Sequence, residues 1–227
     1  MLEIQHTTRV EAPKLSNCMV ARGKTILLQT MAYELLRKYT PEQINLYMVD
    51  CGSMVLKMFE NSIHAGGVVL ASEEEKCKNL FKLLNATVVE RKKILSGKGV
   101  GNFASYLDAG YTDMPLLVVM IDNMAGFKEY FPDETDQINS LTREAQGVGI
   151  SFVVTAATSN AMNYRTQANF GRKIALNCND TADKNILLQK KTAISLDVLR
   201  KLSTDSKIHI EIPRIYIPDN TIVMQMG

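Results

Sequence analysis

Gly23, Lys24 and Thr25 are the residues of this chain best suited to bind a phosphate group. They follow an apolar run, Cys18–Ala21, that we predict as a strand, and they begin a helix predicted to run to Arg37. A helix N-terminus offers unpaired backbone N–H groups and the positive end of its dipole to an anion. A lysine at this place adds charge near the β- and γ-phosphates of a nucleotide, and the threonine hydroxyl can ligate Mg²⁺. Strand, Gly-Lys-Thr and helix together have the layout of a phosphate-binding loop.

This motif is incomplete, because the full form has a glycine five positions before the Gly-Lys pair and Cys18 occupies that position. Glycine is used there because the loop takes positive φ and its backbone approaches the phosphates closely. A helix start that happens to read Gly-Lys-Thr is the alternative interpretation. We predict a weak nucleotide site made by Arg22, Gly23, Lys24 and Thr25.

Asp122 ends the unbroken hydrophobic run Leu116–Asp122, which is typical of a buried parallel strand. P-loop ATPases keep an acid at this place, the Walker B position, where it orients Mg²⁺. An aspartate that merely caps a strand end is the other interpretation, and the earlier Gly-Lys-Thr helix weakens it. We predict Thr25 and Asp122 as the Mg²⁺ ligands.

Strands and helices alternate along the chain, which predicts an α/β fold with a mostly parallel sheet and helices on both faces. A capping box, Ser72–Glu75, predicts the start of a long helix. The other expected helices are Met54–Glu60, Asn102–Leu107, Asp133–Gln146, Asn160–Phe170 and Asp180–Leu188, and the expected strands are Asn45–Asp50, Val68–Leu70, Leu116–Asp122, Ile150–Thr155, Lys173–Leu176, Lys207–Ile212, Arg214–Ile217 and Thr221–Met224. We expect a single domain over residues 1–227, with 1–14 as a leading arm or strand.

Composition and charge are those of an ordinary globular protein, with 46% hydrophobic and 22% charged residues. The net charge of +2 is too small to argue for nucleic acid or an anionic membrane surface. The four cysteines, Cys18, Cys51, Cys77 and Cys178, show no metal-binding spacing, so we expect reduced thiols in a cytosolic compartment. No apolar run reaches membrane-spanning length, so we expect any membrane anchor to lie in a parent protein.

The order of these segments resembles the FtsK/SpoIIIE family of RecA-like P-loop ATPases over roughly residues 15–190. The matching pieces are Gly23-Lys24-Thr25, Thr40–Asp50, Ile63–Val69, Glu90-Arg91, Gly101–Tyr106, Leu116–Asp122, Arg143–Ser151 and Ala168–Ala175. The resemblance implies ATP and Mg²⁺ as ligands. Active members carry a glutamate where this chain has Asn123, and a glutamine that senses the γ-phosphate where it has Ala157. Together with Cys18, these departures imply weak or absent hydrolysis, with no confident catalytic residue.

Degenerate modules of this kind are similar to those of the tandem ATPases of type VII secretion, the EssC/EccC group, and most similar to their C-terminal module. That resemblance implies a regulatory and substrate-recognition role on the cytoplasmic face of the cell membrane. The implied partners are neighbouring ATPase modules, with a hexamer as one arrangement, and WXG100-type secreted substrates. Two alternatives stay open. One is an FtsK-like DNA translocase motor, which the net charge of only +2 and the presence of Asn123 disfavour, and the other is a catalytically silent assembly domain.

Overall fold

The described part of the chain, residues 23–158, 161–176, 194–195 and 221–225, builds one parallel sheet in this computed structural model. The strand order is β2-β1-β3-β4-β7-β5-β6, and every pair of neighbours is parallel. The strands are β1 (Ile44–Asp50), β2 (Ala65–Leu70), β3 (Leu116–Asp122), β4 (Ile150–Ala156), β5 (Arg172–Leu176), β6 (Ile194–Ser195) and β7 (Thr221–Gln225). The prediction of an α/β protein with a parallel sheet is confirmed.

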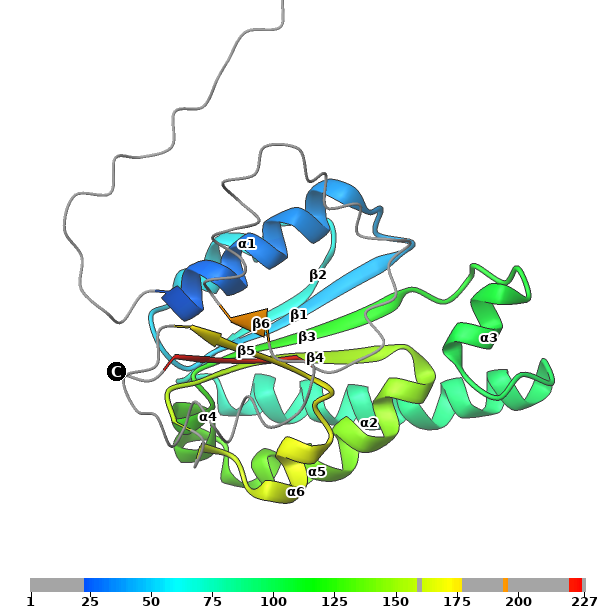
Figure 1. Ribbon diagram of the computed structural model, residues 1–227. Coiled ribbons are helices and arrows are strands. Elements are labelled where there is room, and N and C mark those ends of the chain that lie inside the picture. The colour runs from blue at the N-terminus through cyan, green and yellow to red at the C-terminus, as the bar shows by residue number, and fades with distance from the viewer. Residues whose placement is uncertain (1–22, 159–160, 177–193, 196–220, 226–227) are drawn as a thin grey trace, which may run out of the picture.

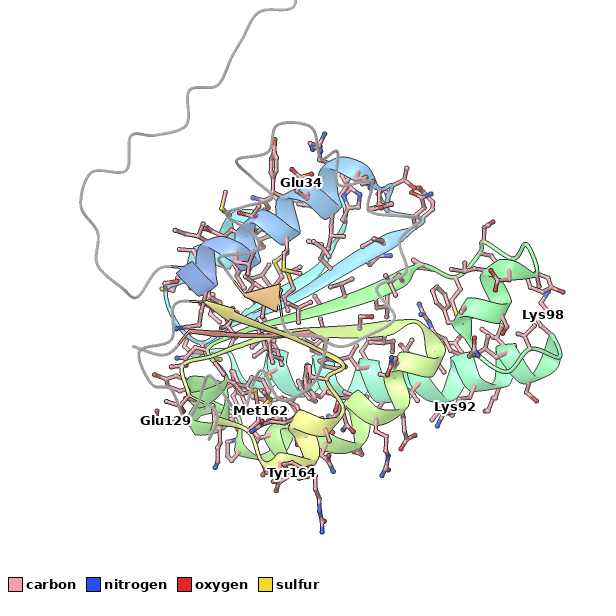
Figure 2. The ribbon with its side chains drawn as sticks, in the orientation of Figure 1. Glu34, Lys92, Lys98, Glu129, Met162 and Tyr164 are labelled. Atoms are coloured by element: carbon pink, nitrogen blue, oxygen red, sulfur yellow. The ribbon has the colours of Figure 1, made fainter. Side chains whose placement is uncertain are left out.

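Helices cover both faces of the sheet, as Figure 1 shows, with α1 on one side and α2, α4, α5 and α6 on the other. Their bounds are α1 (Gly23–Lys38), α2 (Glu74–Gly97), α3 (Phe103–Asp108), α4 (Met124–Tyr130), α5 (Pro132–Ala145) and α6 (Tyr164–Ala168), with short 3₁₀ helices η1 (Val55–Phe59) and η2 (Gln146–Val148). Glu34 on α1 and Tyr164 on α6 mark the outer sides of the two layers in Figure 2. None of the helices among these residues is long and apolar enough to cross a membrane.

Successive residues of the central strands point to opposite faces and so build two separate cores. On β3, Val119 and Ile121 belong to the core under α2, α4 and α5, whereas Val118 and Met120 belong to the core under α1. All seven residues of β3 are buried. A strand buried on both faces must be hydrophobic without alternation, which is why β3 has the bounds predicted from the sequence.

Several elements differ from the sequence prediction, since β2 begins at Ala65 rather than Val68 and β6 was not predicted. The helix expected over Asn160–Phe170 is the five-residue α6, and α4 was not predicted at all. Cys51 and Cys77 are buried and free, as expected. The predicted strand Cys18–Ala21, the leading arm 1–14, the helix 180–188 and the strands 207–212 and 214–217 lie outside the described residues, as do Cys18 and Cys178.

The carboxyl ends of β1, β3 and β4 meet at the same edge of the sheet, beside the first turn of α1. Asp50 and Asp122 are register partners, since each is the last residue of its strand. Val154 is the partner of Ile121, so the residue after it, Thr155, comes level with Asp122. In open α/β sheets, ligands bind in the crevice outside the carboxyl ends of the strands. This edge is therefore where a ligand site is expected.

Candidate nucleotide-binding site

Thr25 and Asp122, the two predicted Mg²⁺ ligands, are brought together by the fold. The Thr25 hydroxyl, in the first turn of α1, donates a hydrogen bond of 3.1 Å to Oδ2 of Asp122 at the end of β3. A hydroxyl and a carboxylate at this distance are oxygen donors of the kind that Mg²⁺ prefers. Within the described residues, no group of three or more His, Cys, Asp or Glu could hold a metal ion. A magnesium ion here would thus take its remaining ligands from phosphates and water.

The other oxygen of Asp122 is held by Thr155, a residue that the sequence analysis did not assign to the site. The buried Thr155 hydroxyl donates a 2.6 Å hydrogen bond to Asp122 Oδ1 and accepts a 2.8 Å hydrogen bond from the backbone N–H of Asn123. A polar residue that ends a buried parallel strand, just as Asp122 does, was the sequence signal for it. Each oxygen of Asp122 therefore has one hydroxyl donor.

Burial disfavours the charged form of Asp122, which is only 3% exposed. Burial raises the pKa of its carboxyl and nearby Asp50 raises it further, while the hydrogen bonds from Thr155 and Thr25 and the Lys24 ammonium oppose the shift. Burial likewise lowers the pKa of Lys24, against the attraction of Asp122. Because both groups are disfavoured in their charged forms, a bound cation and a bound phosphate would each relieve a local cost.

Asp50 shapes the wall of the site rather than its donor set. Its carboxylate accepts hydrogen bonds from the backbone N–H groups of Gly52 (3.1 Å), Met54 (3.1 Å) and Leu56 (2.9 Å). Those bonds hold the turn after β1, in which Met54 has a φ of 58°. A side chain at Gly52 would place its Cβ 3.3 Å from Asp122 Oδ2. The turn therefore keeps side chains away from the carboxylate oxygen that faces Thr25.

Asn123, which the family resemblance placed where active members carry a glutamate, has its side-chain amide hydrogen-bonded to two backbone groups. It has a φ of 67° and is the N-cap of α4, where its Oδ1 accepts a 3.3 Å hydrogen bond from the Gly126 N–H. Its Nδ2 donates a 3.0 Å hydrogen bond to the Cys51 carbonyl. The side chain thus caps α4 through Oδ1 and joins it to the residue after β1 through Nδ2, and it has no proton-accepting carboxylate.

The other residues predicted for the nucleotide site lie partly within the described residues and partly outside them. Gly23 is exposed at the first residue of α1, and Lys24 is half-buried beside it. Ala157 is exposed just after the carboxyl end of β4 and has no polar side-chain atom to reach a phosphate. Arg22 and Cys18 lie outside the described residues. The described half of the predicted loop, with Asp122, is compatible with a magnesium–nucleotide complex.

A separate pocket of about 620 Å³ opens at the opposite edge of the sheet, where β1, β3 and β4 begin. Ile44, Phe103, Leu107 and Met114 give it an apolar lining, and Arg143 stands on its rim. The polar and charged residues that also line it are Glu42, Gln43, Asn102, Thr112, Gln146 and Ser151. The pocket is thus at the other end of the strands that carry Asp50, Asp122 and Thr155.

Sequence comparison finds a family match that covers most of the chain. The model of the FtsK/SpoIIIE family matches residues 6–204. The type VII secretion system protein EssC of Staphylococcus aureus strain Mu50 is 26% identical over 204 residues, which are 88% of this chain and 14% of EssC. The chain therefore spans about one seventh of the length of that relative.

Solved structures of related ATPases share the fold. ATPases 2 and 3 of EssC from Geobacillus thermodenitrificans superpose with a TM-score of 0.65 at 23% identity, over 74% of this chain and 32% of that one. The cytoplasmic domain of EssC gives 0.62 at 22% identity, over 85% and 35%. ATPases 2 and 3 of Thermomonospora curvata EccC, solved with a signal sequence peptide, give 0.61 at 20% identity, over 65% and 28%.

Proposed function

Because this chain belongs to the FtsK/SpoIIIE family, we propose that it is a nucleotide-binding, hydrolysis-poor ATPase module of a type VII protein-secretion motor. The observation that carries the proposal is the contact between the Thr25 hydroxyl and Asp122 Oδ2, at 3.1 Å. It joins the phosphate-binding helix start to the Walker B acid. Lys24, beside both, supplies the positive charge that a phosphate requires.

Each residue of the site has a separate task in nucleotide binding. The backbone N–H groups at the start of α1 bind the phosphates, helped by the helix dipole. The Lys24 ammonium neutralises phosphate charge, and Thr25 and Asp122 hold the cation. Mg²⁺, when bound by Thr25 and Asp122, would supply positive charge that neutralises the phosphates. These tasks together support binding of ATP without requiring that it be hydrolysed.

Slow hydrolysis follows from the residues beside the phosphates. A general base typically contributes about 10²–10⁴-fold to a rate, and Asn123 has no carboxylate to act as one. Its amide is also hydrogen-bonded to the Cys51 carbonyl and the Gly126 N–H, so both of its polar atoms already have backbone partners. Ala157 cannot sense a γ-phosphate because it ends at a methyl group. The two losses support a module that binds nucleotide as a regulatory ligand.

Calorimetric titration with ATP and Mg²⁺ tests the binding site. Wild type should bind, and Lys24→Ala should weaken binding roughly 10–100-fold, the value of a charge-assisted hydrogen bond of about 1.5–3 kcal/mol. Lys82→Ala is the matched control, because Lys82 is an exposed lysine on α2. Undiminished binding in Lys24→Ala would place the nucleotide elsewhere and refute the proposed site.

The proposed module acts next to other ATPase modules, with a hexamer as one assembly, on the cytoplasmic face of the membrane. The support is the similarity to structures described as ATPases 2 and 3 and as a cytoplasmic domain of EssC. Cross-linking of the parent protein through single cysteines introduced on this module tests the placement. Links confined to unrelated proteins would refute it.

Substrate recognition is a second proposed role, and the pocket at the far edge of the sheet is the observation that favours it. A volume of about 620 Å³ with an apolar lining accommodates a few large side chains of a peptide. The related EccC structure contains a signal sequence peptide. We propose that WXG100-type substrates place apolar residues of a helical C-terminal signal in this pocket, beside Phe103 and Leu107.

Fluorescence anisotropy with labelled C-terminal peptides of candidate substrates tests this role. Leu107→Lys should weaken peptide binding at least 10-fold, because it puts an ammonium among apolar groups. Val89→Lys is the control, since Val89 is 55% exposed on α2 and does not line the pocket. Equal affinities of the two variants would exclude the pocket as the peptide site, and no peptide binding to the full parent protein would end the receptor proposal.

A further inference from the structure

Asp122 presents two different oxygens to its surroundings, and Thr155 creates the difference. A threonine hydroxyl has one proton and two lone pairs. The N–H of Asn123 occupies a lone pair of Thr155 at 2.8 Å, and the proton goes to Asp122 Oδ1 at 2.6 Å. Oδ1 is thereby held in the interior, where Thr155 is fully buried, and Oδ2 is left toward Thr25.

We infer that Thr155 is a positioning residue of the magnesium site, which fixes the Asp122 carboxylate so that Oδ2 alone faces the cation. The inference rests on the proposed nucleotide-binding function and extends it to a residue that touches neither phosphate nor metal. Partners that orient a metal-ligating side chain typically change metal affinity 10–100-fold when they are removed. Thr155 reaches this carboxylate from β4, so it links a second strand to the cation.

The same hydroxyl ties the carboxylate to the turn that follows it. Asn123 donates its N–H to Thr155 and starts α4 with a positive φ. Without the hydroxyl, the carboxylate could rotate about its side-chain torsions and the Asn123 N–H would lose its acceptor. Both changes would move Oδ2 relative to Thr25, which is held separately at the start of α1.

Magnesium dependence of ATP binding tests the inference, because it isolates the cation from the rest of the nucleotide. The dissociation constant for ATP is measured with saturating Mg²⁺ and again with EDTA, for wild type, Thr155→Val and Thr155→Ser. Thr155→Val keeps the shape and loses the hydroxyl, and should reduce the gain in affinity from Mg²⁺ on the order of 10-fold. Its affinity in EDTA should match wild type. Thr155→Ser retains the hydroxyl and should recover most of the gain.

Thr142→Val is the matched control, because Thr142 is a fully buried threonine on α5 whose hydroxyl donates to the Ile138 carbonyl. It should lower the melting temperature as Thr155→Val does, and leave the magnesium gain unchanged. An unaltered gain in Thr155→Val, an equal loss in Thr142→Val, or no recovery in Thr155→Ser overturns the inference alone. A wild type that binds no ATP in either condition overturns the proposed function and the inference with it.

Discussion

The hydroxyl of Thr25 and the carboxylate of Asp122 lie 3.1 Å apart, although 97 positions separate them in the chain. Thr25 lies in the first turn of α1, and Asp122 ends β3, a strand whose seven residues are all buried. Their proximity is the geometric basis of the proposed magnesium–nucleotide site. The residue beside them, Asn123, is hydrogen-bonded through its side chain to the Gly126 N–H and the Cys51 carbonyl.

Asn123→Ala should destabilise the fold if the amide is structural. The substitution removes the N-cap bond to Gly126 and the bond to the Cys51 carbonyl, and places alanine at a φ of 67°. We expect a loss of about 1–2 kcal/mol in the free energy of unfolding, the typical cost of losing a cap. Asn123→Gly should lose less, because glycine tolerates positive φ. Urea denaturation measures both, and an Ala variant as stable as wild type would contradict the structural role.

Gly126→Ala should also destabilise the protein, because the β3–α4 turn has no room for a methyl group. A Cβ at Gly126 would lie 2.7 Å from Asn123 Nδ2 and 2.8 Å from the Cys51 carbonyl oxygen. Overpacking of this kind typically costs about 1–3 kcal/mol. Gly97→Ala is the control, since nothing lies within 4 Å of its Cβ, and it should be neutral or slightly stabilising. Equal melting temperatures for the two variants would show that the turn adjusts freely.

Tyr106 should give α3 a pH-dependent stability. Its hydroxyl donates a short hydrogen bond to Asp113, which together with burial raises the pKa of Tyr106 to about 12 and lowers the pKa of Asp113. The folded state thus holds the phenol proton more tightly than the unfolded chain, in which tyrosine titrates near pH ~10. The stabilisation from Tyr106 is full below that pH and is lost as pH rises through about 12.

The Asp113 side of this bond has the opposite dependence. Because its folded pKa is lowered, its contribution is present above the ordinary Asp value of about 3.9 and is lost as pH falls below it. Tyr106→Phe should therefore lower the melting temperature most between these limits. Melting curves at about pH 3, about pH 7.5 and about pH 11.5 measure the difference. A wild-type advantage that stays constant across the series would refute the assignment.

The sequence was sufficient for the central strands of the sheet because these strands are buried on both faces. Leu116–Asp122 has no polar residue before its last position, and its predicted bounds are those of β3. The pairing of Thr25 with Asp122 also followed from motif order, since the carboxyl ends of parallel strands lie at one edge. Local pattern and global fold agree at these residues.

The parts that the sequence did not reveal depend on contacts between distant residues. α4 is only seven residues long, follows an N-cap asparagine with positive φ and contains Gly126, and the sequence analysis did not predict it. The hydrogen bond of Thr155 to Asp122 joins two strands 33 positions apart, and neither residue type alone predicts it. α6 is shorter than expected because it begins only after Asn163, whose side chain accepts a hydrogen bond from the Thr166 N–H as the N-cap.

Steady-state phosphate release by the purified domain with saturating Mg²⁺-ATP tests the central claim most directly: that the site binds nucleotide and scarcely hydrolyses it. Wild type should release phosphate very slowly or not at all, and Asn123→Glu alone should restore little, because Ala157 still leaves the water poorly positioned. Lys24→Ala, measured beside them, reports how much release comes from this site. Turnover of about one per second or faster, a typical enzyme rate, that disappears in Lys24→Ala would contradict the account.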